Sequence, residues 1–369
     1  MTGATTVSVQ EFNLTIALGN TAEEYTGLTL EPILGKYIID RLKTSALVTA
    51  KTTNFPSSPD PDHFPKGKFQ LAGGTDGSAP VDNDYRGTGD PGDRTGIKAL
   101  EDIDAISIIA APGNIDEDVQ GALIEQCERL KDRFAILDSA LTADVTTVKT
   151  QRNKFDTKYA AIYYPSLRIF DPVSGNTIDC PPSGHMAGIY ARVDTERGVH
   201  KAPANEIVRG AVDFTRRINK ETHDLLNPSP TNINVFRDFR ADGRGLRIWG
   251  ARVMTSDTAW KYINVRRLFL FLEESIDEGT QWVVFEPNDE PLWARVRQSI
   301  TAFLTRVWRD GALQGATPEE AFFVKCDRTT MTQDDLDNGK LICLVGVAPV
   351  KPAEFVIIRI SQFTASAEA

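Results

Sequence analysis

The chain has 369 residues, of which 41% are hydrophobic and 25% are charged, as in an ordinary soluble globular protein. A formal net charge of −10 argues against a general binder of nucleic-acid backbones, because such proteins are normally basic. No apolar run approaches the roughly eighteen residues that a membrane-spanning helix needs, so we expect no membrane insertion.

The start of the chain and its cysteines indicate where the protein is made. The first residues have neither the basic nor the apolar region of a signal peptide. The four cysteines are far apart and include no CxxC pair, so we expect buried free thiols. Both observations fit synthesis in a reducing cytoplasm.

The first hundred residues divide into an ordered start and a loop-rich stretch. Residues 6–18 are typical of an extended segment, and residues 31–42 suit a helix that starts at Pro32, a favourable first helical residue. We assign residues 1–50 to the start of an α/β core. Residues 51–97 carry six prolines and eight glycines, which predicts a peripheral loop region.

The middle of the chain alternates strands with helices. Residues 103–112 form an apolar run that predicts a buried strand, and a helix over 119–130 follows with Asp116 or Asp118 as its N-cap. With the strand expected at 134–138 this makes a β-α-β unit, whose two strands are parallel with a right-handed crossover. The further elements that we expect in this part are a strand at 160–164, a helix at 186–194 and strands at 232–239 and 246–253.

Two amphipathic helices and a group of strands complete the chain. Apolar residues recur at alternating steps of three and four over 262–276 and over 293–307, which is the spacing of a helix face. Strands are expected at 282–285, 322–326, 341–350 and 351–363. The fold class is therefore α/β, with a first α/β part at 98–230 and a C-terminal domain at 231–369.

The last predicted strand has no element after it. Residues 355–363 contain the β-forming run Val-Ile-Ile, whose backbone groups need partners. A terminal apolar strand often pairs with a neighbouring chain. The alternative is a strand that closes a sheet within its own chain.

No constellation of catalytic, cofactor-binding or metal-binding residues stands out. The glycine-rich stretch 71–77 lacks the GK[ST] ending of a phosphate-binding loop, and the four histidines lack metal-ligand spacing. The acidic stretch 334–339 lacks the closing glutamate of a calcium loop and predicts a solvated turn. We therefore expect no catalytic, cofactor or metal residues and no cofactor. An α/β enzyme whose site is assembled only by the fold stays open as an alternative.

Several segments occur in a characteristic order along the chain. They are residues 69–77, 96–104, 196–206, 232–236, 282–288, 292–293, 311–315 and 349–355. Taken together, they resemble the contractile tail sheath family of phage tails, R-type pyocins and extracellular contractile injection systems.

The resemblance implies a structural subunit, not an enzyme. Such subunits polymerise with themselves as six-fold rings stacked in a helix around an inner tube protein, with baseplate and terminal cap proteins as further partners. Contraction rotates the compact domains while arms exchanged between neighbours persist, and it drives the tube through a target envelope. The particle would be a phage tail or tail-like apparatus made in a bacterial cytoplasm. On this reading the intersubunit arm strand consists of Phe355, Val356, Ile357, Ile358, Arg359, Ile360 and Phe363.

One feature departs from the family pattern. Nothing before residues 6–12 resembles the N-terminal arm that family members usually have. The resemblance therefore implies either an N-terminally shortened chain or a divergent paralogue, and a paralogue could act as an initiator or cap of the sheath.

Overall fold

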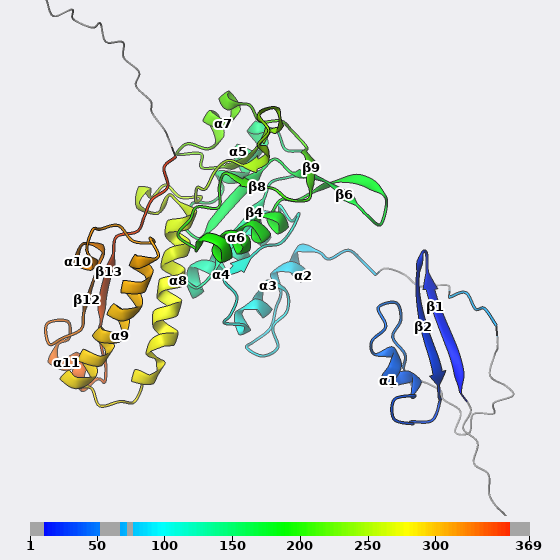
Figure 1. The fold of residues 1–369 in the computed structure, drawn as a ribbon, viewed down its shortest axis with the longest axis horizontal. Helices are drawn as coiled ribbons and strands as arrows, with labels where there is room; N and C mark the ends of the chain where they lie inside the picture. The colour runs from blue at the N-terminus through cyan, green and yellow to red at the C-terminus, as the bar shows by residue number, and fades with distance from the viewer. Residues whose placement is uncertain (1–10, 52–66, 72–76, 355–369) are drawn as a thin grey trace, which may run out of the picture. The chain divides into compact units, whose positions relative to one another are not determined.

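The computed structural model describes residues 11–51, 67–71 and 77–354, and the chain forms two compact units that divide after residue 78 (Figure 1). In the smaller unit, β1 (Phe12–Leu18) pairs antiparallel with β2 (Thr21–Leu28), and α1 (Ile38–Leu42) packs near them. Its own small core contains Tyr25, Leu28 and Leu42.

This unit differs from the expected start of the α/β core. Its strands pair with each other and join no other described strand. The helix expected from Pro32 is confined to α1, because a bridge between Thr29 and Tyr37 holds the preceding residues in a loop.

A six-stranded sheet forms the centre of the larger unit. Its order is β3 (Ile108–Ile109), β4 (Phe134–Asp138), β5 (Ala160–Tyr164), β10 (Asn234–Phe239), β11 (Gly245–Ile248) and β8 (Glu206–Ile207). The first four strands are parallel, and the last two add antiparallel. Every residue of β4 and β5 is buried, as their continuous apolar runs predict for parallel strands covered on both faces.

The predicted β-α-β unit is confirmed. Helix α4 (Glu117–Leu130) connects the parallel strands β3 and β4, and the Asp116 carboxylate caps it by accepting hydrogen bonds from the backbone of Asp118 and Val119. A 3₁₀ turn, η2 (Leu100–Asp102), precedes strand β3, which is shorter than expected because turns at residues 104–105 and 112–113 occupy both ends of the predicted range. The range 51–97, expected as loop, contains the short helices α2 (Asp82–Arg86) and α3 (Gly96–Ala99).

The remaining elements surround this sheet. Helices α5 (Val145–Arg152), α6 (Ser183–Arg197) and α7 (Lys220–Leu226) lie between strands in sequence. A three-stranded antiparallel sheet has the order β7 (Asn176–Cys180), β6 (Leu167–Asp171) and β9 (Ala211–Phe214).

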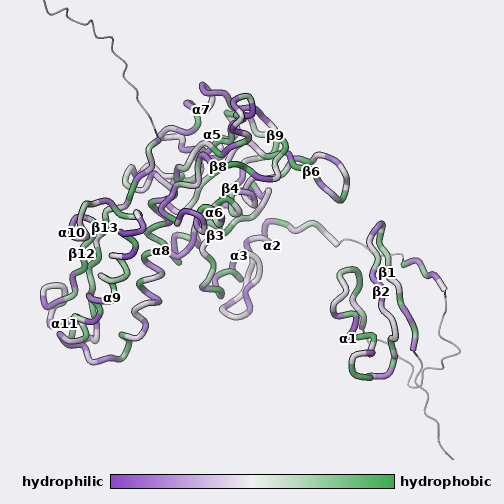
Figure 2. The backbone as a smooth tube through the Cα atoms, in the orientation of Figure 1, coloured by the Kyte–Doolittle hydropathy of each residue, from purple (hydrophilic) through white to green (hydrophobic). Residues whose placement is uncertain are grey.

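The C-terminal part is built on two long helices, α8 (Ile263–Thr280) and α9 (Glu290–Arg309), which the spacing of apolar residues predicts. Figure 2 shows hydrophobic and hydrophilic stretches alternating along both. The strand predicted at 282–285 is wrong: residues 281–283 form the 3₁₀ turn η5. The part ends with α10 (Pro318–Ala321), β12 (Phe322–Lys325), α11 (Gln333–Asp337) and β13 (Leu344–Val347).

Two hydrophobic cores meet within α8. Its residues Ile263 and Leu270 belong to the core around the six-stranded sheet, whereas Leu268 and Leu272 belong to a second core with α9 and β12. The sheet itself continues past residue 230, because β10 pairs with β5. The change of core therefore lies C-terminal to the boundary at 230 that the sequence predicts.

Candidate functional site

The carboxyl ends of the parallel strands are the usual ligand site of α/β enzymes, and the buried Asp138 lies there, at the end of β4. Its carboxylate accepts hydrogen bonds from the backbone N–H groups of Gly113 (2.9 Å) and Ser183 (2.7 Å) and from the Ser183 hydroxyl (2.7 Å). Burial raises the pKa of Asp138. These contacts hold the start of α6 against the sheet, which is a structural role.

The other polar residues considered from the sequence are not brought together. His185, His200 and His223 lie on α6, in the turn after it and on α7, while His63 lies outside the described residues. Over the described ranges, no group of three or more His, Cys, Asp or Glu side chains could hold a metal ion. Most of the glycine-rich stretch 71–77 lies outside these ranges.

The acidic stretch at 334–339 differs from the solvated turn that the sequence predicts. It contains most of helix α11 instead of a simple turn. A capping box starts the helix: the Thr332 hydroxyl accepts a hydrogen bond from the Asp335 N–H, and the Asp335 carboxylate accepts one from the Thr332 N–H. The Asp335 carboxylate therefore serves the start of the helix.

The two-stranded sheet of β12 and β13 leaves one face open. Phe322 pairs with Val347, and Phe322 is buried in the second core. On the other face Phe323 lies directly over Gly346, so close that a Cβ on Gly346 would meet the Phe323 ring at 2.1 Å. Phe323 is 60% exposed. Within residues 77–354, no third strand pairs with this sheet.

After β13 the chain is fastened to the α9 side by backbone hydrogen bonds. The Ala348 N–H donates to the Ala321 carbonyl (2.8 Å), and the Ala348 carbonyl accepts from the Gln314 N–H (2.7 Å). The Val350 N–H donates to the Ala312 carbonyl (3.1 Å). This segment thus continues the pairing of β13 beyond its last residue.

Glu354 then ties the segment to the α/β core. Its two carboxylate oxygens accept hydrogen bonds from Nε and Nη2 of Arg252, both at 2.7 Å. The Tyr262 hydroxyl (3.1 Å) and the Asn227 side-chain amide (2.9 Å) donate to the same carboxylate. We call these four residues, Asn227, Arg252, Tyr262 and Glu354, the carboxylate clamp.

The clamp is a charged site within a nearly dry environment. The Arg252 side chain is 4% exposed and that of Glu354 is 18% exposed. Burial opposes ionisation of Glu354, but its hydrogen bonds to Arg252 and Tyr262 and the charge of Arg252 outweigh burial and hold its pKa below the usual value. Burial, followed by the adjacent Glu354 carboxylate, raises the pKa of Tyr262 to about 12.

The predicted arm strand begins directly after the clamp. Its residues Phe355, Val356, Ile357, Ile358, Arg359, Ile360 and Phe363 lie outside the described residues. The sequence analysis missed the clamp, although Glu354 lies within the segment 349–355 that carried part of the resemblance. The available signal was a glutamate placed directly before the apolar, β-forming run that starts at Phe355.

Comparison with family models covers most of the larger unit. Residues 92–254 match the model of the phage tail sheath protein central domain, and residues 255–363 match that of the phage tail sheath C-terminal domain. The boundary between the two models falls between β11 and α8.

Individual proteins agree with the family models. The chain is 24% identical over 290 residues to the tail sheath protein of Escherichia phage P2, covering 76% of this chain and 70% of that protein. It is 36% identical to a chain of the PVC extracellular contractile injection system sheath complex in its contracted state, with a TM-score of 0.65 over 73% of each chain. It is also 36% identical to a chain of the six-fold symmetrised anti-feeding prophage baseplate, with a TM-score of 0.62 over 72% of this chain and 71% of that one.

Proposed function

The chain belongs to the phage tail sheath family, and from this premise we propose that it is a structural subunit of a contractile sheath in a phage-tail-like injection apparatus. The family consists of structural proteins, and the buried carboxylate at the enzyme-like position, Asp138, already has partners within the chain. No described helix has the length and apolar character needed to cross a membrane.

The clamped C-terminal segment is the single observation that carries the proposal. Residues 348–354 are fixed first to the loop after α9 and to the end of α10, and then to the α/β core, and the predicted arm strand follows immediately. An arm fixed at its base transmits force from a neighbour into the compact domain. We propose that residues 355–363 add as a strand to the sheet of a neighbouring subunit.

The β12–β13 sheet supports strand exchange. An isolated two-stranded sheet is marginally stable in water, and further strands stabilise it. This sheet has unpaired edges within the described part of the larger unit, and Phe323, Leu344 and Val345 are exposed beside them. Backbone pairing suits an arm that must resist separation while the compact domains rotate.

We propose the wider assembly on the same basis. Subunits form six-fold rings stacked around an inner tube protein, with baseplate and cap proteins at the ends, and contraction drives the tube outward. The similarity to a contracted sheath chain and to a chain in a six-fold baseplate structure supports this arrangement. Synthesis in a bacterial cytoplasm, before incorporation into the particle, completes the proposal.

A second role is a sheath paralogue that starts or caps the polymer. The baseplate chain that this protein resembles is the observation in its favour. Such a paralogue would bind the tube end or the baseplate without forming long sheath.

Electron microscopy of negatively stained particles tests both roles. The full chain is co-expressed with the tube and baseplate proteins of its own gene cluster. Long striated tubes around the inner tube are expected for a main sheath subunit. Collars of one or two rings at the baseplate would favour the initiator role, and the absence of both rings and tubes would contradict the proposed function.

A further inference from the structure

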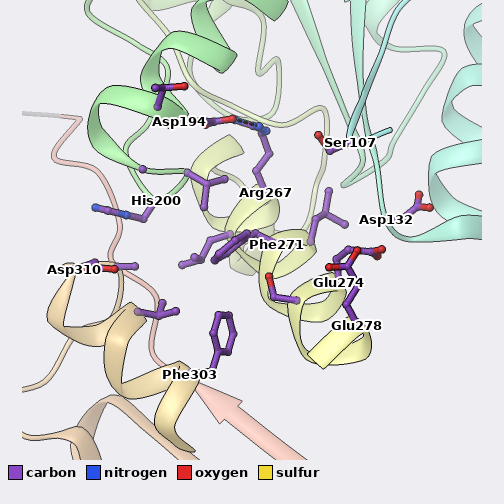
Figure 3. Close-up of a pocket in the computed structure, with 18 of the residues that line it drawn as sticks. Ser107, Asp132, Asp194, His200, Arg267, Phe271, Glu274, Glu278, Phe303 and Asp310 are labelled. Atoms are coloured by element: carbon purple, nitrogen blue, oxygen red, sulfur yellow. Dashed lines mark hydrogen bonds and ion pairs between the residues drawn. The ribbon is translucent and has the colours of Figure 1, made fainter. Parts of the chain in front are cut away.

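An open groove with a volume of about 920 Å³ lies along α8 and α9 (Figure 3). Phe271 of α8 and Phe303 of α9 form part of its wall, with their ring centroids 6.0 Å apart. Phe271 is 44% exposed. The groove therefore offers aromatic faces to solvent and has room for several side chains of a partner.

The groove carries excess negative charge. Six carboxylates and three arginines line it. The carboxylates belong to Asp104, Asp132, Asp194, Glu274, Glu278 and Asp310, and the arginines are Arg197, Arg267 and Arg306. Asp194 is neutralised by Arg267, and Asp132 pairs with Arg133. Over the ranges that the structure describes, the carboxylates of Asp104, Glu274 and Glu278 have neither an ion pair nor a hydrogen bond. We call this feature the acidic groove.

The pKa of Glu274 reflects its burial and the excess negative charge of the groove. Burial, and then the charges of Asp132, Glu278 and other nearby carboxylates, raise its pKa. Figure 3 shows Glu274 and Glu278 together on the side of the groove nearest Asp132, with Phe271 and Phe303 to their left. An aromatic wall beside free carboxylates is the environment that a guanidinium group prefers, because it can stack on the ring and pair with the acid.

The same chain presents such guanidinium groups elsewhere. Arg237 and Arg244 both stack on the ring of Phe239, each with its guanidinium carbon 4.8 Å from the ring centroid, and Arg244 also stacks on Trp249. We call Arg237, Phe239, Arg244 and Trp249 the arginine stack. Arg244 is exposed, and in residues 77–354 neither arginine of the stack has a carboxylate partner.

Within one copy of the chain, the arginine stack does not pair with the carboxylates of the acidic groove. The stack belongs to β10, β11 and the residues next to them, and the neighbouring Arg240 packs against β9 by donating to the Val212 carbonyl. Figure 1 shows β9 and the lower end of α8, which carries Glu278, on different sides of the larger unit. Each surface is therefore left with unmatched charge.

We propose that the arginine stack of one subunit docks into the acidic groove of the next copy of this chain. The contact is heterologous, because it joins two different surfaces, and repetition of such a contact generates rings or helices. The inference rests on the proposed sheath function and assigns one of its subunit contacts. Planar guanidinium groups meet carboxylates at the groove, while Phe271 and Phe303 supply rings on which they stack.

A charge-swap experiment on the full chain tests this contact. The groove variant is Glu274→Lys/Glu278→Lys, and the stack variant is Arg237→Glu/Arg244→Glu. Sedimentation velocity measures self-association, and a tag on one variant measures capture of the other. Each variant alone should associate at least about tenfold more weakly than the wild type, since like charges then face each other. The equimolar mixture should recover association, because every contact between the two variants is again complementary.

Matched controls separate folding from contact. Glu125→Lys/Glu221→Lys changes net charge by the same amount as the groove variant, at exposed positions on α4 and α7, and should associate like the wild type. If the groove variant does not fold, Glu274→Gln/Glu278→Gln replaces it, with weakened association expected. Normal association of either variant alone, or no recovery in the mixture, overturns the contact while leaving the sheath function standing. A wild-type chain that stays monomeric, and forms neither rings nor tubes with its tube protein, overturns both.

Discussion

Arg252 and Glu354 are 102 positions apart in sequence and form a two-pronged ion pair at the base of the C-terminal segment. The pair joins the segment that follows β11 in the α/β core to Glu354, the last described residue of the chain. Because the arginine is 4% exposed, removal of its partner leaves a buried charge without compensation.

Glu354→Gln should destabilise the fold by about 1–3 kcal/mol, since the neutral amide cannot satisfy the buried guanidinium. Thermal unfolding should show a lower Tm, and limited proteolysis should release the residues after 350 sooner. Glu286→Gln is the matched control, because it breaks an ion pair with Arg295 whose side chains are 55% and 42% exposed. That variant should lose less than about 0.5 kcal/mol. Equal losses in both variants would contradict the role of the clamp.

The stabilising effect of the clamp should depend on pH in a defined direction. The folded-state pKa of Glu354 lies below its usual value of 4.5, so its contribution is fully present above that value and is lost as pH falls through the folded pKa. The difference in Tm between the wild type and Glu354→Gln should therefore be constant from about pH 6 to 7 and shrink only in more acidic buffer. A difference that grows as the pH falls would show that the sign is wrong.

The exposed face of the β12–β13 sheet should matter for assembly but not for the stability of the monomer. Phe323→Ser/Leu344→Ser removes two side chains from the face opposite Phe322, and they are 60% and 49% exposed, so little apolar burial is lost. We expect a monomer Tm close to that of the wild type and a clear loss of ring or tube formation in electron micrographs. Phe170→Ser, at a residue 57% exposed on β6, is the control for general surface polarity. Normal assembly of the double variant would exclude this face from the contact.

The elements predicted from sequence are those whose signal is local. The apolar runs of β4 and β5, the Asp116 cap of α4 and the spacing of apolar residues in α8 and α9 each specify structure from neighbouring residues alone. The run at 282–285 has the composition of a strand, but a strand also needs a partner, and the turn between two long helices offers none.

The carboxylate clamp could not be predicted, because its residues are far apart in sequence. The sequence places Glu354 just before the arm, but nothing near Glu354 indicates that its partner is Arg252, which follows β11. Burial of the arginine depends on how residues 227–262 pack around it. Pairing across such a separation is a property of the fold, so the local pattern predicted an arm and missed its anchor.

Proline substitution in the arm tests whether residues 355–363 act between subunits. Ile357→Pro/Ile358→Pro removes two backbone donors that a strand ladder needs, so ring and tube formation should be abolished. The monomer should keep the Tm of the wild type, because the cores and the clamp lie before this segment. Ile357→Val/Ile358→Val keeps both donors and the β-forming character, and it should assemble normally. Loss of folded, soluble protein in the proline variant would instead place the strand within the subunit's own sheet, and unchanged assembly would exclude it from the intersubunit contact.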